Sequence, residues 1–229
     1  MPVTLAFDVY GTLINTHGVV EALHTHVGDK AEAFSQTWRD KQLEYAFRRG
    51  LMQHYESFSV CTKDALNYTC EYYRTPLTEA QKHLLLAEYR ILPPFEDVSE
   101  GLALLSGGGN RLFAFSNGSA DAVTTLLSSA GILDTFLGVV SVDDLKSFKP
   151  NPAVYCHFLR VSGASAGEAW LVSSNPFDVI GAVSAGMKAA WLQRSPEALF
   201  DPWGVEPTIT ISSLIELEER IARYLRRGT

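Results

Sequence analysis

The sequence feature that most constrains the fold is a series of short apolar runs separated by segments with helical periodicity. The runs occupy residues 3–9, 111–115, 137–141, 169–173 and 188–192, with a weaker one at 208–211. Runs of this length without polar alternation are typical of strands that are buried on both faces of a sheet. Helical segments between them indicate right-handed crossovers between parallel strands. The pattern predicts an α/β fold with a doubly wound, mainly parallel, Rossmann-like sheet.

The alternation stops between residues 15 and 95, where no strand pattern is found. Helical periodicity dominates at 31–52, 62–74 and 78–89, and the prolines at 93 and 94 end the last of these helices. We therefore expect an all-helical cap domain, residues 15–95, inserted into a core domain of residues 1–14 and 96–229. Such an insertion leaves a cleft between cap and core, which is a common place for a binding site.

Length and composition are those of an ordinary globular protein. The chain has 229 residues, of which 46% are hydrophobic and 20% are charged, and its formal net charge is −7. Disordered chains combine few apolar residues with high net charge, so this composition argues against disorder. The negative charge disfavours nucleic acid and anionic membranes as partners. We find neither an apolar stretch of ~18 residues, as needed to span a bilayer, nor the basic leader of a signal peptide.

The three cysteines, Cys61, Cys70 and Cys156, are too sparse for a disulfide framework. Cys61 and Cys70 also lie too far apart along a helical pattern to bridge. We expect all three to be buried thiols and the protein to be cytoplasmic.

Polar side chains stand at or just after the ends of four predicted strands. They are Asp8 after the first strand, Ser116 and Asn117 after the second, Lys149 after the third, and Ser173, Asn175 and Asp178 at the fourth. In an open α/β sheet, chemistry takes place at the carboxyl ends of the strands. The fold would thus bring these side chains into one cleft, and this convergence is stronger evidence for a site than any single motif.

Asp8 is the predicted nucleophile. It ends an apolar strand and is followed by Gly11, which permits a sharp turn. A lysine such as Lys149 near this carboxylate would keep it ionised and ready to attack. Taken alone, Asp8 could be a capping or turn aspartate and Lys149 a surface lysine. Their place among converging strand ends favours the catalytic interpretation.

The other strand ends carry groups suited to anion binding and support. Ser116 and Asn117 precede a predicted helix, and a helix N-terminus favours an anion such as a substrate carboxylate. At the fourth strand we expect Asp178 to pair with Lys149, and Asn175 to orient a water. The alternative at both places is simple helix capping.

Arg39, Leu43 and Phe47 are spaced four residues apart in the helix predicted at 31–52, so they share one face. An arginine in an apolar stripe is costly without an anionic partner, and a leaving anion would supply one. The alternative is a salt bridge to a neighbouring acid. His24 and His26 lie on different helix faces, and no zinc spacing or phosphate-binding loop is present. We expect no metal and no cofactor.

Several motifs resemble those of the haloacid dehalogenase superfamily. They are FDVYGTL at residues 7–13, SNG at 116–118, KP at 149–150 and SSNPFD at 173–178. The segment WRDKQLEY at 38–45 and the tripeptide SVD at 141–143 resemble the L-2-haloacid dehalogenases in particular, the type II or (S)-2-haloacid enzymes. The resemblance covers nearly the whole chain, in order.

The resemblance implies a metal-independent hydrolase that acts on carbon–halide bonds. It would convert small (S)-2-haloalkanoic acids to halide and (R)-2-hydroxy acids through an aspartyl-ester intermediate. Phosphatases of the superfamily carry a second aspartate two residues after the nucleophile, with further acids that hold Mg²⁺. Tyr10 stands at that second position here, and Ser174 and Asn175 stand where metal-binding acids would be expected. These residues favour displacement at carbon over phosphoryl transfer.

The resemblance also implies roles for individual residues. Asp8 would form the ester, and Arg39 would receive the halide with help from Asn117. Ser116 would hold the substrate carboxylate. The residues that would steady Asp8 and direct water at the ester are Lys149, Ser173, Asn175 and Asp178, with Thr12 in support. The other substrate-binding residues would be Val9, Tyr10, Leu43, Phe58, Tyr155 and Phe177.

Three positions depart from the family pattern. Phe177 stands where some members have tryptophan, Asn15 replaces a frequent aspartate, and Phe47 replaces a frequent tryptophan. They leave substrate size and leaving group open. The alternatives are a hydrolase with the same nucleophile that opens L-azetidine-2-carboxylate, a Mg²⁺-dependent phosphatase, and an inert binding protein. Because family members are commonly homodimers, we expect a homodimer.

Overall fold

The computed structural model describes residues 2–227, and a six-stranded sheet lies at its centre. The strands are β1 Thr4–Phe7, β2 Arg111–Ser116, β3 Gly138–Ser141, β4 Ala169–Ser173, β5 Lys188–Leu192 and β6 Ile209–Ile211. Their order is β3-β2-β1-β4-β5-β6, and every neighbouring pair among them is parallel. Each strand falls on or within one residue of a predicted apolar run, so the predicted Rossmann-like sheet is confirmed.

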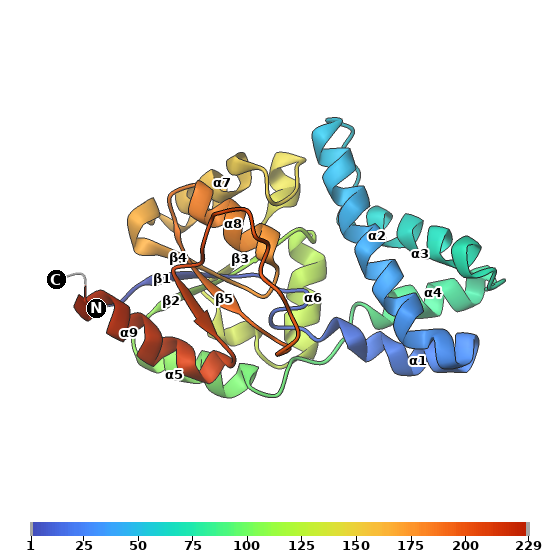
Figure 1. Ribbon diagram of the computed structural model, residues 1–229, viewed down its shortest axis with the longest axis horizontal. Helices are drawn as coiled ribbons and strands as arrows, with labels where there is room; N and C mark the ends of the chain where they lie inside the picture. Colours follow the sequence, from blue (N-terminus) through green and yellow to red (C-terminus); the bar gives the residue numbers. More distant parts are fainter. Residues whose placement is uncertain (1, 228–229) are drawn as a thin grey trace.

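Helices cover both faces of this sheet (Figure 1). They are α5 Val98–Gly107, α6 Ala120–Ser129, α7 Pro152–Ser162, α8 Pro176–Ser184 and α9 Leu217–Arg227. Neighbouring side chains of a strand point to opposite faces. Leu5 and Phe7 of β1 therefore join a core cluster with α5, α6 and α9, whereas Ala6 joins a second cluster with α7 and α8. This two-sided burial explains why the strands lack polar alternation.

The segment between β1 and α5 is helical, as predicted, and forms a cap beside the sheet (Figure 1). Its helices are α1 Val19–Val27, α2 Ala31–Leu51, α3 Phe58–Tyr73 and α4 Glu79–Glu88. The last three match predicted helices, although α3 begins earlier than expected, after the N-cap Ser57. None of the predicted helix ranges covers α1, although His24 and His26 were expected to lie on a helix. Its N-cap residue, Gly18, makes no side-chain capping bond, so the usual start signal is missing.

Two chain segments connect the cap to the core, and they lie side by side. Ile14 forms an antiparallel bridge with Pro94. The amide of Asn15 donates to the carbonyl of Pro93 at 2.9 Å, and the amide of Phe95 donates to the carbonyl of Leu13 at 3.0 Å. The cap therefore leaves and rejoins the core at one place.

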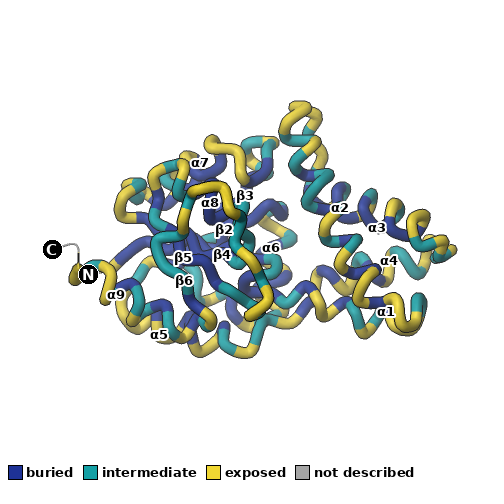
Figure 2. Tube along the Cα trace, viewed as in Figure 1, coloured by how far each residue is buried: buried dark blue, intermediate teal, exposed yellow. Residues whose placement is uncertain are grey.

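Burial follows this architecture, with most of the sheet dark at the centre of Figure 2, β6 largely teal, and the exposed residues on outer helix faces and loops. Cys61 and Cys70 are buried as predicted, but Cys156 is exposed, so that prediction was wrong. Its neighbours Tyr155 and His157 are buried in α7, which turns Cys156 outward. Within residues 2–227, no helix combines the length and the apolar character needed to cross a membrane.

Candidate active site

The carboxylate of Asp8 lies directly after β1 and is held on both oxygens. Thr12 Oγ1 donates to Oδ2 at 2.7 Å, and Asn175 Nδ2 donates to the same oxygen at 2.8 Å. Lys149 Nζ donates to Oδ1 at 3.2 Å. The residue is only 7% exposed. Three donors from separate parts of the chain thus fix the orientation of this carboxylate.

The loop after Asp8 turns sharply, which places Thr12 beside the carboxylate. The carbonyl of Val9 accepts hydrogen bonds from the amides of Thr12, Leu13 and Ile14. Gly11 has φ of 84°, in the left-handed region that favours glycine. Ser174 closes the loop from the other side, because its Oγ donates to the Gly11 carbonyl at 2.7 Å.

Lys149 is a buried cation between two carboxylates. Its side chain is 1% exposed, and Nζ lies 2.7 Å from Asp178 Oδ2 as well as 3.2 Å from Asp8 Oδ1. The ammonium also donates to the carbonyl of Phe115 at 2.8 Å. The expected pair of Asp178 with Lys149 is therefore present, and Lys149 joins the ends of the first and fourth strands electrostatically.

Asp178 is fully buried and has its own support from α7. Burial raises its pKa above the ordinary value of 3.8, and the charge of Lys149 opposes that rise. Tyr155 donates its hydroxyl to Asp178 Oδ1 at 2.8 Å. The resemblance had suggested Tyr155 as a substrate-binding residue. The structure instead places it fully buried, with its hydroxyl against Asp178.

Ser173, Ser116 and Asn117 order the backbone around these groups. Ser173 Oγ accepts from the Asn175 amide at 3.1 Å, and Ser116 Oγ accepts from the Gly118 amide at 3.1 Å. Asn117 Oδ1 accepts from the Lys149 amide at 2.9 Å. Because this bond engages the Oδ1 atom of Asn117, its Nδ2 group is the donor that could bind an anion.

Arg39 reaches the site from the cap helix α2. One guanidinium nitrogen donates to Gln42 Oε1 at 2.6 Å, and another donates to the carbonyl of Tyr10 at 3.2 Å. No carboxylate of the described chain pairs with Arg39, so the alternative of a salt bridge is not found there. Neutral oxygens therefore orient a cation whose charge remains available to an anion near Asp8.

Aromatic side chains from cap and core meet at the boundary between the two. The rings of Tyr10 and Phe58 are 5.7 Å apart, and those of Phe47 and Phe177 are 5.0 Å apart. Leu43 lies one turn after Arg39 on α2 and is partly buried. Burial raises the pKa of Tyr10 to about 12, so its hydroxyl stays neutral at physiological pH. These residues supply an apolar wall on both sides of the cap–core boundary.

Two supporting residues were not predicted from sequence as parts of the site. Gln42 orients Arg39 and is held in turn by the hydroxyl of Thr62 at 2.5 Å. Ser174 gives its amide to Thr12 Oγ1 at 2.9 Å. Gln42 follows Arg39 by three residues on one helix, and this spacing is the sequence signal that could have predicted their contact. Ser174 stood at a strand end but was considered only as a missing metal ligand.

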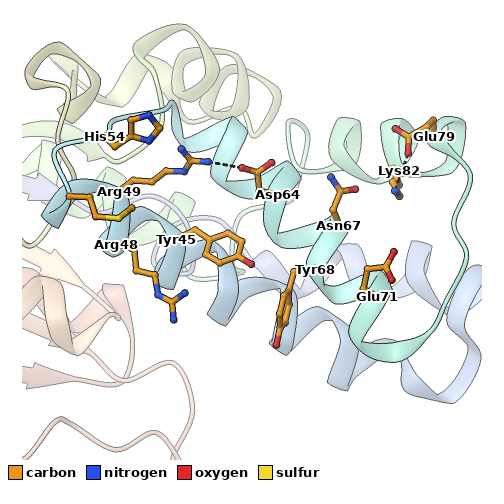
Figure 3. A pocket seen from close by; sticks show the side chains of 11 residues that line it. Tyr45, Arg48, Arg49, His54, Asp64, Asn67, Tyr68, Glu71, Glu79 and Lys82 are labelled. Carbon is orange, nitrogen blue, oxygen red and sulfur yellow. Dashed lines mark hydrogen bonds and ion pairs between the residues drawn. The ribbon is translucent and has the colours of Figure 1, made fainter.

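A separate hollow of about 870 Å³ lies on the cap between α2, α3 and α4 (Figure 3). Four of its charged groups form two ion pairs, Arg49 with Asp64 at 2.8 Å and Lys82 with Glu79 at 3.0 Å. It contains none of the predicted site residues, and we do not assign the reaction to it. Nowhere in residues 2–227 do three His, Cys, Asp or Glu side chains gather as a candidate metal site.

Comparisons with known proteins agree with this geometry. A family model for haloacid dehalogenase-like hydrolases matches residues 3–186. Haloacetate dehalogenase H-2 of Moraxella sp. (strain B) is 37% identical over 218 residues, which cover 95% of this chain and 97% of that protein. The (S)-2-haloacid dehalogenase of Pseudomonas sp. (strain YL) is 34% identical over 227 residues, which cover 98% and 97% of the two chains.

Solved structures show the same likeness over nearly the whole chain. The L-2-haloacid dehalogenase from Xanthobacter autotrophicus with covalently bound chloropropionic acid superposes with a TM-score of 0.91 at 30% identity. The superposition covers 97% of this chain and 99% of that one. From its fold, its strand-end residues and these comparisons, we conclude that the chain belongs to the haloacid dehalogenase-like hydrolases.

Proposed function

We propose that this protein hydrolyses small (S)-2-haloalkanoic acids to (R)-2-hydroxy acids and halide through an ester on Asp8. The observation that carries the proposal is a buried carboxylate at a strand end, with a lysine 3.2 Å from one oxygen and two neutral donors on the other. The (S)-2-haloacid dehalogenases that resemble the chain along nearly its full length support the same reaction.

In the first step, one oxygen of Asp8 attacks C2 of the substrate from the side opposite the halogen. The new C–O bond takes the electron pair of Asp8, and the halide leaves with the pair of the C–X bond, so C2 is inverted. Arg39 and the amide nitrogen of Asn117 receive the halide, while Ser116 and the start of α6 hold the substrate carboxylate. Hydrogen bonds to Gln42 and Tyr10 pre-orient Arg39 for this purpose.

In the second step, water attacks the ester carbonyl of Asp8 and releases the hydroxy acid. Asn175 contacts Asp8 directly, and Ser173 fixes the Asn175 backbone, so both hold the ester for attack. One proton of the water passes to a basic group, and the other passes to the hydroxy-acid oxygen as its bond to Asp8 breaks. Asp178 is the candidate base, because Lys149 Nζ lies 2.7 Å from it and 3.2 Å from Asp8. Hydrolysis restores the carboxylate of Asp8, with one oxygen derived from water.

A single turnover in H₂¹⁸O with excess enzyme tests this scheme. The heavy oxygen should enter Asp8, not the product, and mass spectrometry of the peptide that contains Asp8 would detect it. Asp8→Asn should abolish halide release without loss of the fold, whereas Asp134→Asn, at an exposed position between α6 and β3, serves as the matched control. Heavy oxygen in the hydroxy acid after the first turnover would contradict an Asp8 ester.

The proposal also includes the domain division, the oligomeric state and the cellular location of the protein. The paired connections at Leu13–Asn15 and Pro93–Phe95 support a cap of residues 15–95 and a core of 1–14 and 96–229, of which residues 1, 228 and 229 lie outside the described chain. Leu51 and Met52, 86% and 64% exposed at the end of α2, support a homodimer formed through the cap, which light scattering would test.

Free thiols in place of disulfides support a cytoplasmic location.

A further inference from the structure

A cleft of about 530 Å³ leads away from the proposed catalytic centre. It opens between α3 and α4 of the cap and the first turn of α6 in the core. Tyr10, two residues after Asp8, lines its inner end together with Gln42, the partner of Arg39. This volume falls in the range of sites for ligands much larger than 2-chloropropionate. The cleft is therefore large enough for a substituent that extends beyond C2.

The outer end of this cleft carries unpaired positive charge. Lys63 of α3 and Arg90, just after α4, line it, and Asp121 of α6 is the acidic residue that faces them. Neither Lys63 nor Arg90 forms an ion pair with a carboxylate of the described chain. On the outer cap, by contrast, Arg49 is paired with Asp64. Two cations without an ion-pair partner in the described chain therefore line the same cleft.

Arg90 acts on the inner end of the cleft as well as on its mouth. Its positive charge lowers the pKa of the Tyr10 hydroxyl, against the larger effect of burial. Arg39 acts on the same hydroxyl in the same direction. Both arginines therefore place positive charge near the inner end of the cleft.

The wall of the cleft also contains a polar group without a partner. Tyr89 is 6% exposed, and its hydroxyl has no hydrogen bond within residues 2–227. Its ring packs against Trp38 at 4.7 Å. A buried hydroxyl without a partner is unfavourable. A ligand oxygen bound in the cleft would supply the missing partner.

We infer that this cleft is a subsite for a second carboxylate, so that the enzyme accepts 2-halodicarboxylic acids such as 2-chlorosuccinate and 2-chloroglutarate. The inference rests on the proposed function. C2 would lie at Asp8 and the first carboxylate at Ser116. The second carboxylate would extend past Tyr10 and Phe58 to Arg90, which is the recognition residue. The chemistry at Asp8 is unchanged, and only the length and charge of the substrate differ.

Kinetics with matched substrates test the inference. We would measure kcat/KM for (S)-2-chlorosuccinate, (S)-2-chloroglutarate and (S)-2-chlorobutyrate with the wild type and Arg90→Met. The variant should lose about tenfold in kcat/KM for the better dicarboxylic acid, mainly through KM, and change less than about twofold for chlorobutyrate. Arg74→Met removes the same charge from an exposed cap position outside the cleft and should change neither.

Each other outcome is decisive. Equal losses for all three substrates would mean that Arg90 attracts anions in general, and would overturn the subsite. Turnover of chlorobutyrate but of neither dicarboxylic acid would also overturn it, while leaving the proposed function intact. If no haloacid is hydrolysed, the subsite can still be tested by calorimetry, which measures the binding of glutarate, a dicarboxylate without a halogen. Binding that weakens about tenfold in Arg90→Met would support the subsite even then, and absence of binding would refute it.

Discussion

Replacement of Lys149 by methionine tests the electrostatic basis of the site. Methionine keeps an unbranched side chain but removes the charge and every donor of the ammonium group. The variant leaves Asp8 and Asp178 without the cation that lies between them. We expect both activity and the free energy of unfolding to fall.

The size of the effect follows from the two ion pairs. Nζ lies 3.2 Å from Asp8 and 2.7 Å from Asp178, which gives Coulomb energies of about 5 and 6 kcal/mol at an effective dielectric constant of ~20. The cost of taking all three groups out of water offsets most of this attraction. Loss of one partner of a buried pair destabilises a protein by about 3–5 kcal/mol. A comparable loss in the transition state would lower kcat by about 10³-fold.

Two assays measure these quantities. Urea denaturation gives the free energy of unfolding, and chloride release from (S)-2-chloropropionate gives kcat. The matched control is Lys146→Met, because Lys146 is 65% exposed and pairs with Asp143 on the surface, where such pairs contribute about 1 kcal/mol or less. A Lys149→Met variant with wild-type kcat, or with stability within about 1 kcal/mol of the wild type, would refute the reasoning.

Three further predictions concern the surroundings of the site. Gly181→Ala should lower kcat and reduce the free energy of unfolding, measured in urea, by about 1–3 kcal/mol, because the added Cβ would lie 2.7 Å from Tyr155 Cζ. The control is Gly167→Ala, where the added Cβ meets no atom within 4 Å. Tyr89→Phe removes a buried hydroxyl without a partner in the described chain, so the free energy of unfolding should stay unchanged or rise by up to about 1 kcal/mol. Burial raises the pKa of Asp178 above 3.8 in the folded state, so the folded chain binds this proton more tightly than the unfolded chain does. The contribution of Asp178 to the free energy of unfolding should therefore decrease as pH rises above 3.8. Asp178→Asn should remove this decrease from urea measurements between about pH 4 and 7.

Each of these has an outcome that would contradict it. Wild-type activity in Gly181→Ala would mean that Tyr155 does not hold Asp178 in a catalytically needed position. A stability loss above about 1 kcal/mol in Tyr89→Phe would reveal a hydrogen bond that the structure lacks. A pH dependence of stability that Asp178→Asn leaves unchanged would show that Asp178 binds protons equally in the folded and unfolded chains.

The sheet was predictable because its strands are buried on both sides, which leaves continuous apolar runs in the sequence. The same logic applies to Asp8, Lys149 and Asp178, since parallel strands bring their carboxyl ends to one edge. Their contacts in the structure follow directly from that placement. The catalytic roles given to them are still predictions, which the experiments above address.

Other features depend on packing between distant segments and left little trace in the sequence. Tyr155 lies on the buried face of α7, and nothing in its local sequence showed that its hydroxyl would meet Asp178. Cys156 is the next residue on the same helix, and its outward direction follows from which face α7 buries. Helix α1 lacked a capping signal, and its packing within the cap replaces that signal.

The surroundings of the Lys149 ammonium also limit what this group can do chemically. It has three protons, and Asp8, Asp178 and the carbonyl of Phe115 each accept one. No N–H is left over for a water molecule, a substrate oxygen or a departing halide. We therefore expect Lys149 to act as a fixed counter-ion and not as a proton shuttle, so that a proton released while the ester breaks down would travel by another route.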